Sequence, residues 1–542
     1  MDIVEQFLKK HYRLFFFAVA LLLLYPALHS GYIFLLDWTV TPNVTLADIR
    51  WGSDPVTTIV ARLASISISF AVWQRLFLLG IVFFLGMAGF RLARTTNNIY
   101  AQYFSGLFLI FNPFIYARLA EQPGIAAGSA ALFWSAVYLL EYLEEVRMRK
   151  LFWAAGCAGL AVAFFPHSLF LVALLVSVVL LFDYERRRDL LFLGKSFFML
   201  GAGVLLLNAN WLAGSFLGQN TSRALAVVGF TAQDAQAFAT RAIGGDSVYF
   251  TVLALQGYWG EYQDRFISVQ DNPLWEVAFL LMLLLAGWGI GKTWKKSLPT
   301  RALVVVFGLA WVLAIGVTSP IFAPLSLWLY DHVSFYLGLR EPQKWVALLV
   351  LAYAYWGSWG VKYLLAWKGI ANHRKLVGIF CMALPVVFSF SMLSGLHAHL
   401  TPHQFPAEWQ AAKNYLAANS VPGKILFLPW HQYAELDFAG KNVVVPARAF
   451  FGPQIVQGNN TEFGGVYSHA LDASTLTIEK YISKKNQPAA HIAYENFPRD
   501  MQALDIQMII LAKTEDWQDY AWLDRIGIEK VLENDKLIIY KL

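Results

Sequence analysis

Long apolar stretches recur over most of the chain, separated by shorter polar or charged segments. A helix needs about 20 apolar residues to cross the ~30 Å hydrocarbon core of a membrane. The pattern therefore predicts a helical membrane domain with about eleven transmembrane helices. We expect these helices at residues 14–36, 73–92, 98–114, 124–142, 151–165, 168–182, 190–217, 274–290, 302–319, 344–367 and 376–396.

The pattern changes after residue 396, where short β-rich runs alternate with helical segments. The periodicities predict helices at 406–419 and 474–485, and strands at 424–430, 442–446, 506–512, 529–532 and 536–540. The chain thus divides into a polytopic transmembrane domain, residues 1–396, and a small α/β domain, residues 397–542.

Basic residues gather in alternate connections between the predicted helices, at 9–13, 91–94, 147–150, 186–188, 292–301 and 368–375. By the positive-inside rule these connections lie in the cytoplasm. We expect a cytoplasmic N-terminus on a retained signal-anchor helix, an extracytoplasmic α/β domain, and a bacterial plasma membrane as the location.

Composition supports the membrane class, because 58% of the residues are hydrophobic and only 14% are charged. The net charge of +6 is compatible with an anionic partner, but the basic residues lie mostly in short connections. Their expected task is to orient the helices, so we expect membrane lipid and no nucleic acid as a partner. The two cysteines, Cys157 and Cys381, lie in apolar segments and form neither a disulfide framework nor a metal site.

Three of the predicted outward segments are long, at residues 37–72, 218–272 and 320–343. Connections of this length usually carry function or are disordered. Within the first, residues 55–71 resemble a helix that lies flat in the membrane interface, or one that packs on its neighbours.

Asp37 follows the first predicted span immediately, and Trp38 comes after it. A carboxylate at this depth could take a proton from an acceptor hydroxyl as a general base, with Trp38 against the sugar or acceptor. Alternatively, Asp37 caps a segment or pairs with an arginine. For Asp48 and Asp54 in the same loop a structural role is favoured, since Asp54 can cap the helix that begins at Pro55.

Basic residues near predicted helix ends are candidates for binding a donor phosphate. Arg340 and Lys344 flank Pro342 at the start of the tenth predicted helix, where exposed backbone N–H groups favour anions. Arg118 follows a helix that ends near a proline, and His167 lies in a short outward turn. The alternatives are snorkelling charges for Arg340 and Lys344, a surface ion pair for Arg118 or Glu121, and a structural role for His167.

Aromatic and acidic residues that could contact a sugar or acceptor lie in the same regions and in the second long loop. Sugars offer apolar faces to aromatic rings and hydroxyl groups to carboxylates, although aromatic residues also form membrane-interface belts. The candidates are Glu121, Tyr258, Trp259, Glu261, Asp264 and Glu341.

Histidines and polar loops near the second domain offer weaker candidates. His397, His399 and His403 lie in a predicted linker without a carboxylate partner, which favours a structural role over a metal site. The loops around 427–433 and 450–462 end strands and are expected to face the membrane domain or an acceptor glycan.

Many predicted helices, an acidic residue in the first outward loop, long outward loops and a C-terminal domain together resemble the GT-C superfamily of glycosyltransferases. Segments 112–122, 340–344 and 428–431 are similar to those of large bacterial multi-pass proteins grouped near it. The resemblance implies sugar transfer from a polyprenyl-phosphate donor to an extracytoplasmic glycan, lipid or protein, with Asp37 as the catalytic carboxylate. Many members carry paired acidic residues there, whereas this chain has Asp37 followed by Trp38.

A divalent cofactor, Mg²⁺ or Mn²⁺, is compatible with mixed carboxylates in such a loop but is not required by them. Two other functions fit the same pattern. A lipid-linked oligosaccharide flippase or transporter would carry ionisable groups near mid-membrane and broken helices in matching halves. A non-catalytic cell-envelope assembly protein would tolerate changes at Asp37.

Overall fold

The computed structural model describes residues 3–42, 69–216, 232–419, 422–463, 466–468, 472–482, 493–514 and 516–542. The helical stretch predicted at 55–71 falls outside these residues except for its last three positions, and Asp48 and Asp54 also lie outside them. Parts of the long connections 37–72 and 218–272 are likewise not described.

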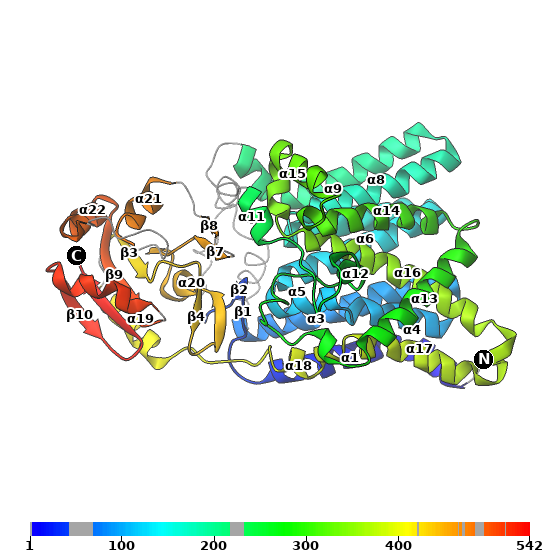
Figure 1. The fold of residues 1–542 in the computed structure, drawn as a ribbon, viewed down its shortest axis with the longest axis horizontal. Helices are drawn as coiled ribbons and strands as arrows, with labels where there is room; N and C mark the ends of the chain where they lie inside the picture. Colours follow the sequence, from blue (N-terminus) through cyan, green and yellow to red (C-terminus); the bar gives the residue numbers. More distant parts are fainter. Residues whose placement is uncertain are drawn as a thin grey trace.

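A bundle of long helices forms the larger part of the molecule, and a smaller sheet domain lies at one end of it (Figure 1). Every predicted span corresponds to a helix or to a bent helix pair. These helices are α1 (Ile3–Leu24), α3 (Phe70–Leu92), α4 (Ile99–Ile110) with α5 (Pro113–Glu121), α6 (Pro123–Glu145), α7 (Met148–Phe164), α8 (Ser168–Arg187), α9 (Leu190–Phe216), α13 (Trp275–Thr293), α14 (Leu298–Ile315), α16 (Val346–Leu365) and α17 (Arg374–Phe388).

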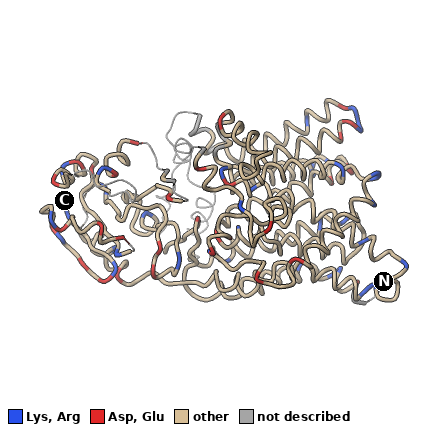
Figure 2. Tube along the Cα trace, viewed as in Figure 1, with Lys and Arg blue, Asp and Glu red and all other residues tan. Residues whose placement is uncertain are grey.

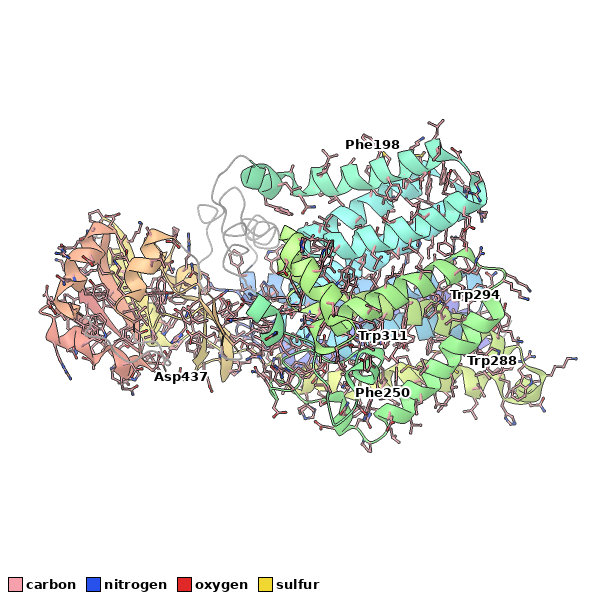
Figure 3. All side chains as sticks on the ribbon, turned by 45° about the horizontal axis from the view of Figure 1, so that its top comes forward. Phe198, Phe250, Trp288, Trp294, Trp311 and Asp437 are labelled. Atoms are coloured by element: carbon pink, nitrogen blue, oxygen red, sulfur yellow. The ribbon has the colours of Figure 1, made fainter. Side chains whose placement is uncertain are left out.

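In the described part of the chain, eight helices are long and apolar enough to cross a membrane, or nine if the bent pair α4–α5 is one span. The other two predicted spans are the 17-residue α7 and the 20-residue α16. Exposed apolar side chains such as Phe198 on α9 and Trp288 on α13 lie on the outside of the bundle (Figure 3). The protein is an integral membrane protein with the predicted helical class.

The predicted spans differ from the observed helices at their ends, and three of them differ most. The first helix begins at Ile3 and ends at Leu24, because Pro26 follows and opens a short 3₁₀ turn. The third span breaks before Pro113, with a 42° bend between α4 and α5. The last predicted span ends as a helix at Phe388 instead of continuing to residue 396.

The centre of the bundle is α16, which is buried along most of its length. It crosses α13 where Gly360 faces the Leu285 carbonyl and Gly289 faces the Trp356 carbonyl, with no room for a Cβ atom at either glycine. Small residues at such crossings let helix backbones approach closely. The tight packing fixes the start of α16, and with it the charged turn that precedes the helix.

Positive charge is concentrated at the end of the bundle that is remote from the sheet domain (Figure 2). The N-terminal end of the described chain lies there, and the C-terminus lies in the sheet domain at the opposite end (Figure 1). The basic connections α6–α7, α8–α9, α13–α14 and α16–α17 supply this charge. The alternation that the sequence predicted is therefore present as a charge difference between the two ends.

The sheet domain is built on five strands in the order β10-β11-β9-β3-β6. Parallel strands β3 (Lys424–Leu428), β9 (Ile506–Ala512) and β6 (Ile455–Val456) continue into antiparallel β11 (Leu537–Lys541) and β10 (Glu529–Glu533). The faces of β3 and β9 pack into two apolar clusters, one including Trp409 of α19 (Ala407–Ala418) and the other Phe497 of α22 (Phe497–Ala503). The predicted strand 506–512 matches β9, whereas the predicted helix 474–485 is the shorter α21 (Ala473–Glu479).

Two hairpins attach the sheet domain to the bundle. The first loop forms β1 (Phe34–Leu35) and β2 (Trp38–Thr39), and the sheet domain contributes β4 (Tyr433–Leu436) and β5 (Lys441–Val444). The Val444 N–H donates to the Leu36 carbonyl at 2.9 Å. This backbone bond holds the tip of the first loop against β5, and Tyr433 of β4 is the partner of Val444 in the hairpin.

Candidate functional site

Asp37 lies in the two-residue turn between β1 and β2, where the two domains meet. Its N–H donates to the Glu121 carbonyl at 3.1 Å. Its carboxylate accepts hydrogen bonds from Gln122 Nε2 at 2.6 Å and from the Tyr433 hydroxyl at 2.7 Å. The side chain is exposed to solvent, so the carboxylate is both oriented by two donors and reachable by another molecule.

The surroundings of Asp37 favour its protonated form. Crowding by protein atoms and the nearby Glu341 carboxylate raise the pKa of Asp37, while the Tyr433 and Gln122 hydrogen bonds lower it. The net shift is upward. A carboxylate with a raised pKa is a stronger base, which suits it to accept a proton.

The short helix α5 brings Arg118 and Gln122 to this site. The Asn112 side chain caps α5 by accepting from the Ile115 N–H at 3.0 Å, and Pro113 occupies the first turn, where it needs no N–H partner. Residues four apart share a helix face, and Arg118 Nη1 donates to Gln122 Oε1. Arg118 is fully buried.

Glu341 is the centre of a buried charge cluster beside Asp37. Its carboxylate lies 3.4 Å from Arg118 Nη1 and 3.5 Å from Lys344 Nζ, and accepts from Trp259 Nε1 at 3.1 Å. Burial alone would raise the pKa of Glu341, but the charges of Lys344 and Arg118 outweigh it and lower the pKa to about 2. Glu341 is therefore a permanent anion that holds two cations.

The remaining basic candidates lie on the other side of Lys344. Lys344 Nζ donates to the Gly338 carbonyl at 3.3 Å and lies 5.3 Å from the Phe165 ring centroid. His167 packs directly against Gly338, where a Cβ atom would clash with its imidazole ring. Arg340 pairs with Asp234 at 3.9 Å. The structure thus brings all four predicted phosphate-binding residues into one region.

Arg118 keeps unused hydrogen-bonding capacity inside this cluster. Its guanidinium lies 4.2 Å from the Tyr258 ring centroid, and its Nε and Nη2 atoms have no hydrogen-bond partner among the described residues. Buried donors without partners are costly, and a cation more so. An anion placed against Arg118 would remove that cost.

The sugar-binding candidates separate into two groups. Trp259 and Tyr258 line the charge cluster, and Glu261 is buried behind them, where it accepts from the Gly257 N–H at 3.0 Å. Burial raises the pKa of Glu261 to about 8. Asp264 instead is exposed at a turn with a left-handed φ of 53°, and its side chain makes no hydrogen bond or ion pair with the described cluster residues. Trp38 packs on Phe77 of α3, with ring centroids 5.2 Å apart.

Glu121 belongs to a second polar group at the domain junction. It accepts from Arg265 Nε at 3.0 Å, and its other oxygen lies 3.1 Å from His399 Nε2. Arg265 also donates to the Asn442 carbonyl of β5 at 2.9 Å. The Glu121 side chain is buried, so its ion pair with Arg265 is a buried pair within the membrane domain and not a surface one, and His399 and Asn442 contact it from the second domain.

Sequence reasoning did not select Gln122, Tyr433, Arg265 or His399 as site residues. Gln122 was within reach, because it follows Arg118 by one helical turn. Tyr433 lies in the segment 427–433, which was expected to face the membrane domain or an acceptor glycan, but nothing in the sequence links it to Asp37, 396 positions away.

The described residues do not form a ligand set for a divalent ion. Among them, no group of three or more His, Cys, Asp or Glu side chains is arranged to hold a metal. The Glu341 carboxylate, which shares the Gln122 side-chain amide with Asp37, is instead paired with Arg118 and Lys344. No metal-dependent step is therefore assigned to the described residues.

No protein-family model and no curated protein matches the sequence. Among solved structures, the arabinofuranosyltransferase AftD from Mycobacteria is similar over 98% of this chain, with a TM-score of 0.58 and 14% sequence identity. The match covers 40% of the AftD chain. ArnT from Cupriavidus metallidurans in the apo state is 14% identical, with a TM-score of 0.49 over 98% of both chains. The likeness to AftD shows that this chain has a GT-C-like membrane fold, as the sequence predicted.

Proposed function

We propose that this protein is a glycosyltransferase that moves a sugar from a polyprenyl-phosphate donor to an acceptor outside the cytoplasm. The observation that carries the proposal is the pairing of an exposed, oriented carboxylate, Asp37, with a buried cation set beside it. Arg118 and Lys344 share the single anion Glu341, and Arg118 still has two donors without described partners. The site therefore offers a base and a place for an anion side by side.

The chemistry follows from those two elements. Asp37 accepts the proton of an acceptor hydroxyl as its oxygen attacks the anomeric carbon of the donor sugar. The bond between that carbon and the phosphate oxygen breaks, and the electron pair leaves with the polyprenyl phosphate. Arg118, Lys344 and Arg340 stabilise the negative charge that develops on the leaving phosphate.

Tyr433 and Gln122 have supporting roles in this scheme. Their donated hydrogen bonds fix the Asp37 carboxylate in one orientation, at 2.7 and 2.6 Å. Because Tyr433 belongs to the sheet domain, the base is complete only when the two domains are in contact. We therefore place the acceptor at the domain junction, with Trp38 and Trp259 nearby.

The charge difference between the two ends supports an orientation. By the positive-inside rule, the basic end of the bundle faces the cytoplasm. Asp37, the cation set and the sheet domain then face the outside, where a lipid-linked donor presents its sugar.

Two other functions were considered from the sequence. A flippase would need broken helices in matching halves of the bundle. The described helices include one bent pair, α4–α5, so the pattern is not matched in them. A non-catalytic assembly protein gives no reason for an exposed carboxylate held by donors from both domains.

The proposal is tested by incubating the purified protein with a panel of radiolabelled polyprenyl-phosphate sugars and cell-envelope acceptors, with and without Mg²⁺ or Mn²⁺. We expect transfer from at least one donor, and loss of that transfer in Arg118→Gln. Lys295→Gln, a change at the remote basic end, is the matched control. Absence of transfer with any donor, together with facilitated movement of the lipid across vesicles, would favour the flippase instead.

A further inference from the structure

A groove with an estimated volume of about 530 Å³ lies among α1, α3, α4 and α6. It lies away from Asp37, because its polar end is lined by Arg91 at the C-terminal end of α3 and by Arg13 in the middle of α1, whereas Asp37 lies beyond the C-terminal end of α1. Arg91 pairs with Glu141, which also pairs with Lys150 at the start of α7, so this end of the groove lies beside the basic α6–α7 connection. The groove is therefore separate from the proposed transfer site.

The lining of the groove changes from basic to apolar along α3. Arg91 is followed by Arg94 of η3 (Arg94–Thr96), whereas Phe84 and Met87 precede them. At 1.5 Å per residue, the seven residues from Phe84 to Arg91 span roughly 10 Å along the helix axis. A ligand in this groove would meet guanidinium groups at one end and hydrocarbon at the other.

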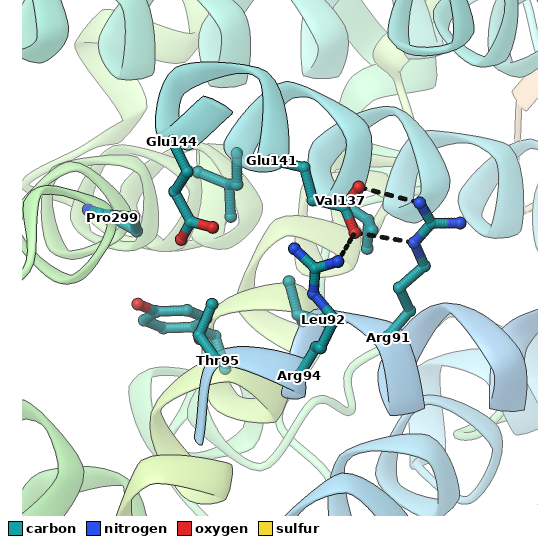
Figure 4. Close-up of a pocket in the computed structure, with 10 residues that line it drawn as sticks. Arg91, Leu92, Arg94, Thr95, Val137, Glu141, Glu144 and Pro299 are labelled. Atoms are coloured by element: carbon teal, nitrogen blue, oxygen red, sulfur yellow. Dashed lines mark hydrogen bonds and ion pairs between the residues drawn. The ribbon is translucent and has the colours of Figure 1, made fainter. Parts of the chain in front are cut away.

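The positive charge at the polar end exceeds the negative charge around it. None of the lining residues is acidic. Behind them, Arg91 and Arg94 flank Glu141, with distances of 2.7 Å from Arg91 Nε and 3.9 Å from Arg94 Nη1 (Figure 4). The charged residues of this region are the cations Arg13, Arg91, Arg94, Arg147 and Lys150 and the carboxylates Glu141, Glu144 and Glu145.

Two of the arginines are available to an incoming anion. Arg13 is exposed and its Nε donates to the Tyr12 hydroxyl at 3.2 Å. The Arg94 side chain is 48% exposed and reaches Glu145 only at 3.5 Å. Arg91, by contrast, donates to both oxygens of Glu141 and lies over the Tyr138 ring. It therefore lines the groove without being available to a ligand.

We propose that this groove binds an anionic glycerophospholipid, with its phosphate between Arg13 and Arg94 and an acyl chain along Phe84 and Met87. Basic pockets between transmembrane helices on the cytoplasmic side are suited to anionic headgroups. The charge selects an anionic headgroup over a zwitterionic one, and the apolar floor selects a lipid over a free phosphate. A bound lipid would also tie α1 to α3 and α6.

The experiment measures binding of dioleoyl phosphatidylglycerol, dioleoyl phosphatidylcholine and soluble glycerol phosphate to the purified full-length protein by native mass spectrometry. A thermal-shift series at increasing lipid concentration accompanies it, because a ligand that binds only the folded state raises the midpoint. We expect preferential binding of phosphatidylglycerol. The double change Arg13→Gln with Arg94→Gln should weaken it about thirtyfold, since each basic side chain near the headgroup contributes about a factor of five.

Two further variants keep the test decisive. Met87→Trp fills the apolar part without changing charge and should weaken lipid binding, and Lys295→Gln, outside the groove, should leave it unchanged. Equal binding of both lipids, an equal loss in Lys295→Gln, or full binding in Met87→Trp would each overturn the proposal. Binding of glycerol phosphate as tight as that of the lipid would show a headgroup site alone and would also overturn it.

Discussion

The Tyr433 hydroxyl donates a 2.7 Å hydrogen bond to the Asp37 carboxylate, joining the sheet domain to the first loop of the membrane domain. Because of this contact, residues of both domains hold the carboxylate of the proposed base in place. The contact also gives the sheet domain a direct part in the proposed transfer.

Replacing Tyr433 by Phe should shift the pH dependence of transfer. The lost hydrogen bond stabilised the charged carboxylate, so its removal raises the pKa of Asp37 further. The base is then protonated at a higher pH, and the acid limb of kcat/KM against pH moves upward. An unchanged acid limb would show that Asp37 does not control it.

Glu341→Gln should destabilise the membrane domain as well as impair donor binding. Removing the anion leaves Lys344 and Arg118 as buried cations without their shared partner. Breaking a buried ion pair typically costs about 3–5 kcal/mol. We expect a thermal midpoint lower by several degrees in detergent, whereas Glu435→Gln, an exposed carboxylate on β4, should change little. Equal midpoints for the two variants would contradict the cluster's structural role.

Phe463 of the sheet domain should matter for transfer although it is not charged. Its ring stacks on Phe238 at 4.6 Å and meets Trp259 edge-on at 4.7 Å. Trp259 in turn donates to Glu341. Two aromatic contacts are worth about 0.5–1.5 kcal/mol each, so Phe463→Ala should reduce kcat/KM by about tenfold.

The matched control for that change is Phe198→Ala, which removes an exposed ring from the outside of α9 (Figure 3). Transfer by the control should equal that of the wild type. Similar losses in both variants would assign the effect to general destabilisation.

The sheet domain should lose stability at alkaline pH through His431. Its imidazole lies 2.8 Å from both Glu462 and Asp516. Burial would lower the pKa of His431, but the two carboxylates outweigh it and raise the pKa from 6.5 to about 9. The stabilisation is therefore complete below pH 6.5 and lost as pH rises through about 9.

This linkage is measured as the difference in thermal midpoint between the wild type and His431→Gln. The difference should be largest below pH 6.5 and shrink above pH 9. A difference that stays constant over this interval would show that His431 is not charged in the folded protein.

The membrane class was predictable because apolar length dominates every other signal in the sequence. The GT-C-like fold was instead implied by the resemblance of the loop arrangement and of segments 112–122, 340–344 and 428–431 to that superfamily. The ends of the helices were harder to predict, because Pro26 and Pro113 interrupt apolar runs that otherwise continue. The strands β6, β7 (Thr461–Phe463) and β8 (Val466–Ser468) were missed because they have only two or three residues, too few for a periodicity.

The candidate site could be predicted in part. Arg118 and Glu341 stood out as charges near helix ends, and the structure brings them within 3.4 Å. Asp264 was selected as a carboxylate beside aromatic residues in the second long loop, but it lies at an exposed turn. The contact of Tyr433 with Asp37 could not be predicted, because it depends on a backbone contact between β5 and the first loop.

The central claim, that Asp37 is the base of a sugar transfer, is tested most directly by comparing wild type and Asp37→Asn for both donor binding and transfer. Asparagine keeps the size of the side chain and can still contact Gln122 and Tyr433, but it cannot accept the proton. The account predicts that Asp37→Asn binds the donor like the wild type and transfers about 10²–10⁴-fold more slowly. Transfer at the wild-type rate by the folded variant would contradict it.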